Sequence, residues 1–190
     1  MEPLGFVTAM WNDLPAYDLS HLTFLIVDSN KHMRTIVRQV LKALGARSVF
    51  ETKEGAEAYQ AMKAMNPDIV MSAMMMDPVN GLELSTMIRT SVDSPNPYVP
   101  IIMVSGHTEE HHIYNARDAG VDEFLAKPVS AHTIYSRVVE VIRHRRPFVK
   151  SRSYFGPDRR RREDPNYTGA RRRITDQDDS DENITILADG

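Results

Sequence analysis

Short apolar runs alternate with amphipathic segments along most of the chain, beginning at LTFLIV (22–27). Runs of this length without internal alternation are typical of strands that are buried on both faces of a sheet. From residue 31 to 44 the apolar residues recur at helical spacing, and Gly45 follows as a stop signal. The pattern then repeats. We predict strands over 22–27, 47–51, 68–72, 101–105 and 122–126, and helices over 31–44, 55–65, 81–90, 108–119 and 130–146.

The order of these elements predicts the class of fold. Strands that are each followed by a helix imply a parallel sheet with helices on both of its faces, a doubly wound α/β fold. We expect this domain over residues 21–146. Residues 1–20 are expected to form an N-terminal arm, in which Trp11 could hold the arm against the body or a partner. Residues 147–190 are expected to form a largely disordered tail.

The charge is divided along the chain. The net charge is −6 over residues 1–142, +9 over 143–173 and −6 over 174–190. An acidic body is therefore followed by a strongly basic segment and an acidic end.

The composition excludes several classes of protein. The 190 residues include no Cys, so disulfides and thiolate metal sites are excluded and a reducing compartment is expected. The first residues lack the basic region of a signal peptide. No apolar run approaches the roughly 18 residues that a membrane span needs. A cytoplasmic location is expected.

Polar residues stand where the predicted strands end. Parallel sheets of this kind bind ligands beyond the carboxyl ends of their strands. At those places the sequence has Asp28 and Ser29, then Ala73, then Ser105, then Lys127. We take these residues as the candidate site.

The motifs around these positions resemble the receiver domains of two-component response regulators, of the chemotaxis-regulator type. The resemblance covers roughly residues 21–145. It implies a flavodoxin-like five-stranded sheet of order 2-1-3-4-5. In that family, acids bind Mg²⁺ and a central Asp accepts a phosphoryl group from a histidine kinase. In the same family, phosphorylation changes the packing of the face formed by the fourth helix, fifth strand and fifth helix. The motifs that carry the resemblance are LIVDSN (25–30), PDIV (67–70), Gly81, PIIMVSGHT (100–108) and DEFLAKP (122–128).

The match is partial at the residues that perform the chemistry. Asp28 corresponds to the first acid, and Ser105, Lys127 and the switch aromatic at Phe124 are retained. Ser29 stands in place of the second acid, Ala73 in place of the phosphoacceptor, and Asp77 in place of a Pro.

These departures argue against phosphorylation at the site. Mg²⁺ is normally held by carboxylates, and only Asp28 remains, so we expect no cofactor, with weak Mg²⁺ binding at Asp28 as the residual alternative. Alanine offers no nucleophile, so we expect a pseudo-receiver that is not an enzyme. Lys127 is expected to pair with Asp28. Asp77, up to roughly 13 Å from position 73 in an extended chain, is the alternative acceptor. Alanine is also the usual engineered block, but Ser29 and Asp77 depart independently, which favours natural divergence.

The basic tail contains an imperfect repeat, YFGPDRRRRED (154–164) and NYTGARRRITD (166–176). The guanidinium group of arginine binds a phosphate through two hydrogen bonds and can stack on aromatic rings. One hypothesis is therefore binding of cyclic di-GMP or nucleic acid, and the other is a solvated run that pairs with the acidic end. For the body we expect contact with a histidine kinase, another response regulator or a motor or effector protein, with a homodimer as a further alternative. The candidate phosphate-binding residues are Arg159, Arg160, Arg161, Arg162, Arg171, Arg172 and Arg173.

Overall fold

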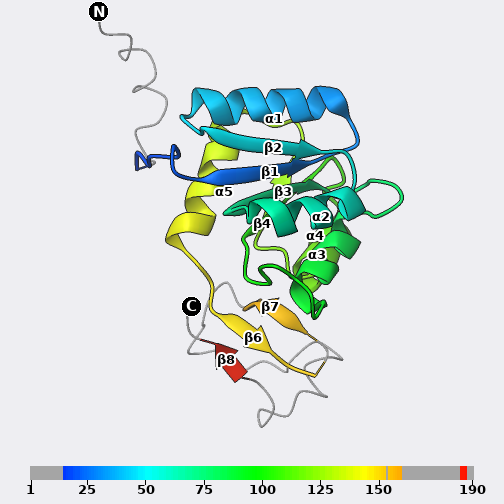
Figure 1. Cartoon of the computed structure of the whole chain (residues 1–190). Helices are drawn as coiled ribbons and strands as arrows, with labels where there is room; N and C mark the ends of the chain where they lie inside the picture. The colour runs from blue at the N-terminus through cyan, green and yellow to red at the C-terminus, as the bar shows by residue number, and fades with distance from the viewer. Residues whose placement is uncertain (1–14, 153, 160–184, 188–190) are drawn as a thin grey trace, which may run out of the picture.

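The computed structural model describes residues 15–152, 154–159 and 185–187. Five strands and five helices alternate over the first part of this range (Figure 1). The strands are β1 (Thr23–Val27), β2 (Ser48–Thr52), β3 (Ile69–Ala73), β4 (Ile101–Ser105) and β5 (Glu123–Ala126). The helices are α1 (Lys31–Ala43), α2 (Gly55–Met65), α3 (Gly81–Thr90), α4 (Glu110–Asp118) and α5 (Ala131–Arg143).

The five strands form one parallel sheet in the order β2-β1-β3-β4-β5. This confirms the predicted fold class and strand order. Because all strands run in one direction, their carboxyl ends meet at the same edge of the sheet. The register aligns Val27 with Ser72 on one side and with Thr52 on the other.

Helices cover both faces of the sheet and enclose two apolar cores. On one face, α1 and α5 pack on alternate residues of the strands, with Leu41 and Val138 fully buried. On the other face, α2, α3 and α4 pack on the intervening residues, with Met62 and Ile88 fully buried. The uninterrupted apolar character of the strands follows from this arrangement, since every position of a central strand faces one core or the other.

Several helices begin at the side chains that the sequence would suggest. Asn30, Asn80 and Ser130 cap α1, α3 and α5, and each accepts hydrogen bonds from free backbone N–H groups of the first turn. Two predicted boundaries differ. The fourth helix begins at Glu110 rather than residue 108, because the His107 N–H bonds to Ser105 Oγ and the chain stays in a loop. The fifth ends at Arg143 rather than residue 146, ahead of Pro147.

The chain continues after α5 into a second, small sheet. Strands β6 (Phe148–Lys150) and β7 (Phe155–Pro157) form an antiparallel hairpin, and β8 (Thr185–Leu187) pairs with the other edge of β6. This sheet lies on the opposite side of the main sheet from α1 (Figure 1). The sequence predicted a largely disordered tail from residue 147, whereas the described part of that tail begins with ordered strands. Phe148 and Tyr154 are buried there, which accounts for the order.

Arg89 of α3 connects this hairpin to the main body. Its guanidinium is buried, pairs with Asp122 at 2.9 Å, and donates hydrogen bonds to the carbonyls of Pro97, Val99 and Gly120. Burial lowers the pKa of Arg89, and the charge of Asp122 opposes that shift. The ring of Phe148 lies over the guanidinium, 5.1 Å from ring centroid to Cζ. Phe148 therefore shields a buried charge that would otherwise meet water.

The end of the N-terminal arm is held by α5. Tyr135 Oη donates to the Pro15 carbonyl at 2.6 Å and accepts from the Tyr17 N–H at 2.8 Å. Trp11, for which a contact was predicted, lies outside the described residues. Among the described helices, none combines the length and the apolar character that crossing a membrane requires.

Candidate functional site

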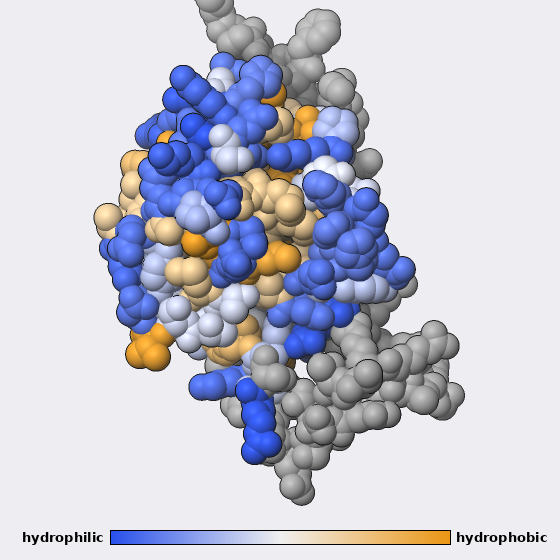
Figure 2. Space-filling view, turned by 90° about the vertical axis from the view of Figure 1, so that its right-hand side faces the viewer, coloured by the Kyte–Doolittle hydropathy of each residue, from blue (hydrophilic) through white to orange (hydrophobic). Residues whose placement is uncertain are grey.

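The candidate site lies at the edge where the strands end. Asp28 directly follows β1, Ala73 closes β3, Ser105 closes β4 and Lys127 directly follows β5. Figure 2 faces this edge and shows apolar surface at its centre, flanked by polar surface. The fold thus brings together the four positions that the sequence singled out, and Ser29 lies exposed beside them.

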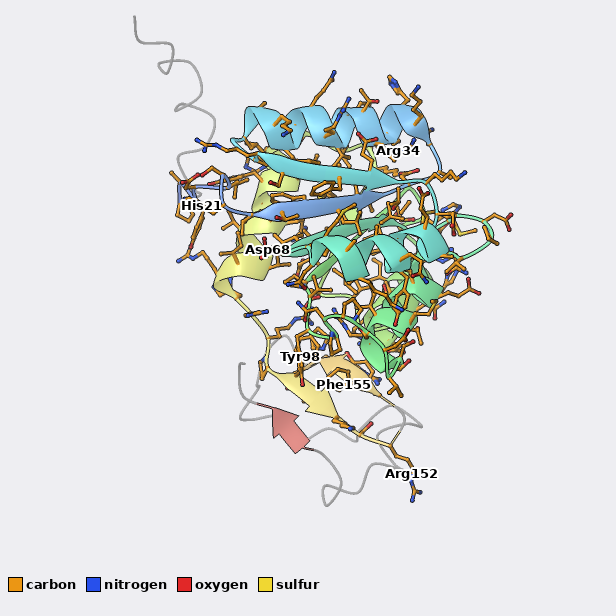
Figure 3. The ribbon with its side chains drawn as sticks, viewed as in Figure 1. His21, Arg34, Asp68, Tyr98, Arg152 and Phe155 are labelled. Atoms are coloured by element: carbon orange, nitrogen blue, oxygen red, sulfur yellow. The ribbon has the colours of Figure 1, made fainter. Side chains whose placement is uncertain are left out.

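Asp28 is the one carboxylate among these four positions, and both of its oxygens are engaged. Oδ2 accepts from Lys127 Nζ at 2.9 Å, and Oδ1 accepts from the Asn30 N–H at 2.8 Å. The Asp28 carbonyl accepts from Arg34 Nη1 at 2.7 Å, and Figure 3 shows Arg34 near this end of β1. The pair between Asp28 and Lys127 that the sequence predicted is confirmed. It is partly shielded from solvent, which strengthens it relative to a surface pair.

Ala73 occupies the centre of the site and is buried. Its carbonyl accepts from Ser72 Oγ at 3.0 Å, and α3 begins close against it. A Cβ on Gly81 would lie 2.1 Å from the Ala73 oxygen, so only glycine fits there. The backbone of the receiver pocket is therefore tightly packed although its central side chain is a methyl group.

The hydroxyl of Ser105 is occupied within the protein. It lies 3.8 Å from Met74 Sδ, to which it donates, and it accepts from the His107 N–H at 3.0 Å. Met74 is buried, Met76 is half-buried, and Met75 is 62% exposed. Of these three, Met74 contacts the site through its thioether.

The donor set does not fit Mg²⁺. This ion prefers oxygen ligands that include one or two free carboxylates, whereas Asp28 is already bound to Lys127 and Asn30. Within residues 15–159, apart from position 153, and 185–187, no group of three His, Asp or Glu side chains is placed to hold a metal ion.

The other predicted residues lie apart from this cluster. Phe124 is half-buried beneath α4 and packs against the core on that face of the sheet. Asp77 is exposed in the loop after β3. Arg159 pairs with Asp118 at 3.3 Å and stacks over the Tyr154 ring. The remaining arginines predicted to bind phosphate lie outside the described residues: Arg160, Arg161, Arg162, Arg171, Arg172 and Arg173.

Sequence reasoning missed two features of the site. It did not identify Met74 as the partner of Ser105, because nothing in the sequence signals a bond between a hydroxyl and a thioether. It also did not assign Asn30 or Arg34 to the support of Asp28. Asn30 could have been found, since it directly precedes a predicted helix and is a favoured N-cap residue.

Together, the fold and the side chains at its strand ends define a protein of the doubly wound α/β class with a candidate site at the carboxyl edge of its parallel sheet. The response regulator receiver domain matches residues 24–139. The chain belongs to the response regulator receiver family, the signalling domains of two-component systems.

Curated relatives support this assignment. Chemotaxis protein CheY1 of Helicobacter pylori is 29% identical over 123 residues, which cover 64% of this chain and 97% of the relative. Chemotaxis protein CheY-3 of Vibrio cholerae is 28% identical over 121 residues, covering 64% of this chain and 92% of the relative.

Solved structures share the fold. A putative response regulator from Chloroflexus aurantiacus matches with a TM-score of 0.59 at 24% identity, covering 64% of this chain and 97% of that one. Chemotaxis response regulator CheY4 of Vibrio cholerae matches with a TM-score of 0.58 at 23% identity, covering 63% and 98%. The chain is thus a CheY-like receiver with additional segments at both ends.

Proposed function

We propose that this receiver signals without phosphoryl transfer at position 73 and without Mg²⁺, and that it acts by contact with other signalling proteins. It is then a pseudo-receiver and not an enzyme. The observation that carries the proposal is Ala73 at the end of β3, where the family places its acceptor carboxylate.

The surrounding contacts support this reading. In the family, the hydroxyl and the lysine bind the oxygens of the new phosphoryl group. Here the Ser105 hydroxyl is directed to Met74 Sδ, and the Lys127 ammonium is held by Asp28. Both groups therefore have partners within the protein. These contacts stabilise one arrangement of the pocket without a phosphoryl group.

The face formed by α4, β5 and α5 is the proposed contact surface. Ile113 and Tyr114 of α4 are 40% and 44% exposed, and Phe124 of β5 is half-buried beneath that helix. Exposed apolar and aromatic side chains of this kind are typical of residues that dominate the energy of an interface. Receiver domains contact histidine kinases and effector proteins, and we propose partners of these classes.

The chemical part of the proposal is tested with a phosphoryl donor. The full chain is incubated with acetyl phosphate and millimolar Mg²⁺, and its intact mass is measured. The variant Ser29→Asp/Ala73→Asp serves as the matched control, because it restores both missing carboxylates. We expect a base-labile phosphoryl adduct on the variant and none on the natural chain. An adduct on the natural chain would overturn the proposal, and its mapping to Asp77 would establish the alternative acceptor.

The contact part is tested with purified histidine kinases and effector proteins of the same organism. The variant Ile113→Glu/Tyr114→Glu should weaken binding at least tenfold. Val92→Glu is the control, because Val92 is fully exposed away from this face. The affinity should not change when donor and Mg²⁺ are added. Equal affinities for both variants would exclude this face.

A further inference from the structure

The segment that joins α5 to the hairpin is rich in basic residues. Residues 143–152 contain four arginines and one lysine but no acid. Arg146 is used within the fold, since it donates to the carbonyls of Asp122 and Asp158. The other four are exposed, and none forms an ion pair with any described residue. These four are Arg143, Arg145, Lys150 and Arg152.

An exposed aromatic ring lies beside these cations. Tyr98, in the loop before β4, is 41% exposed and packs edge-on against Phe148 and Phe155, with ring centroids 5.0 and 5.5 Å apart. Lys150 is directly opposite Phe155 in the hairpin, so both side chains leave the same face of it. Figure 3 shows Tyr98 next to Phe155, and Arg152 projecting away from the body near the turn of the hairpin.

We propose that this surface, made by Tyr98, Phe155, Lys150 and Arg152, binds single-stranded nucleic acid. Lys150 ends β6 and Arg152 follows two residues later in the bend after the strand, so the two cations can contact two phosphates of one linear chain. A base can stack on the exposed ring of Tyr98 while Lys150 and Arg152 contact phosphates. Rings combined with cations in this way are the usual means of binding single strands.

The chain carries its own competitor for this surface. Strand β8 pairs with β6 so that Thr185 is opposite Lys150. Five acids occur in the segment 176–182, directly before β8 in the sequence. Glu182 is the acid of this segment nearest to Thr185 in the sequence. We expect the negative charge of this segment to lower the affinity of the surface for nucleic acid.

The test measures binding of a fluorescent oligo-dT of about 20 nucleotides to the full chain. The variant Lys150→Gln/Arg152→Gln should bind about tenfold more weakly. It should also reduce the slope of log K against log salt by about 1.4, or 0.7 for each lost contact. Lys31→Gln/Lys53→Gln is the matched control. It removes the same charge at exposed positions elsewhere and, like the test variant, leaves the arginines after residue 158 unchanged. Equal effects of the two pairs, or no binding by the natural chain, would overturn the proposal.

Two further measurements separate stacking and competition from general attraction. Tyr98→Leu keeps an apolar side chain but removes the flat ring, so it should weaken oligo-dT about threefold and leave inorganic polyphosphate unchanged. An equal loss for both probes would overturn the stacking role. Replacing the five acids of 176–182 by their amides should tighten oligo-dT binding at least threefold, and unchanged affinity would overturn the competition. None of these outcomes depends on whether the receiver pocket accepts phosphoryl groups.

Discussion

Lys127 Nζ lies 2.9 Å from Asp28 Oδ2, although the two residues are 99 positions apart in the sequence. They come from β1 and β5, which are separated in the sheet by β3 and β4. Ala73, at the end of β3, offers no charge between them. The lysine therefore reaches across the site to Asp28, the one carboxylate among the four strand-end positions.

Restoring the two missing acids should make stability depend on magnesium. Two carboxylates about 5 Å apart repel by roughly 3 kcal/mol at an effective dielectric near 20. We expect Ser29→Asp/Ala73→Asp to lower the free energy of unfolding by about 1–3 kcal/mol in metal-free buffer, and Mg²⁺ to recover that loss. Urea unfolding with and without Mg²⁺ measures both effects. The uncharged Ser29→Asn/Ala73→Asn is the control, and a response of the natural chain to Mg²⁺ would contradict the explanation.

Gly81 should tolerate no side chain. An added Cβ would meet the Ala73 carbonyl at 2.1 Å, and that oxygen belongs to a central strand that cannot move freely. Gly81→Ala should therefore cost about 1–3 kcal/mol or more of unfolding free energy. Gly106→Ala is the comparison, because a Cβ there meets nothing within 4 Å. Similar melting curves for the two variants would show that the α3 start can shift.

The hairpin should be part of the folded unit. A chain that ends at residue 159 keeps β6 and β7, whereas one that ends at residue 146 loses the buried side chains of Phe148 and Tyr154. At about 1.5–3 kcal/mol for each side chain, the shorter chain should lose roughly 3–6 kcal/mol of unfolding free energy. Urea unfolding of both chains measures the difference. If the two unfold alike, the hairpin contributes nothing to the stability of the body.

Tyr154 should make stability depend on pH in the alkaline range. Burial raises the pKa of its phenol above the ordinary value of 10.0, and Arg159 partly opposes the shift. Below pH 10 the phenol is protonated in both the folded and the unfolded state. Above it the unfolded state ionises first, so the stability of the fold falls as the pH rises towards the folded pKa.

The matching variant is Tyr154→Phe. It loses the hydrogen bond from Tyr154 Oη to the Pro157 carbonyl, 2.7 Å long, and should cost about 1 kcal/mol at neutral pH. The difference from the natural chain should shrink above pH 10, as measured by urea unfolding at several pH values. Tyr59, whose pKa is also raised, is present in both proteins and its effect cancels. A constant difference would show that Tyr154 ionises alike in both states.

Much of the fold could be predicted because its signals are local. The three central strands β1, β3 and β4 are short, mostly apolar runs, and Asn30, Asn80 and Ser130 precede their helices as capping residues. The positions of the site could be predicted for a related reason, since parallel strands bring their carboxyl ends to one edge. The pairing of Lys127 with Asp28 followed from the same rule once Ala73 was seen to carry no charge.

The hairpin could not be predicted in this way. Its two strands have three residues each, which is too short for any periodicity to show. The hairpin is held in place by contacts with residues distant in the sequence. Phe148 lies over Arg89, and Arg159 pairs with Asp118. In the sequence, Arg159 appears only as part of a basic run, and nothing marks Arg89 as buried.

By itself, the sequence determined the alternation of strands and helices and the meeting of Asp28, Ser105 and Lys127 around the methyl side chain of Ala73. The tertiary structure alone decided that Ser105 bonds to Met74, that Arg89 is buried against Asp122, and that the tail begins as a hairpin beneath the main sheet. The physical reason is the range of the interactions. Backbone patterns and caps act within a few residues, whereas side-chain pairing depends on which surfaces the completed sheet brings into contact.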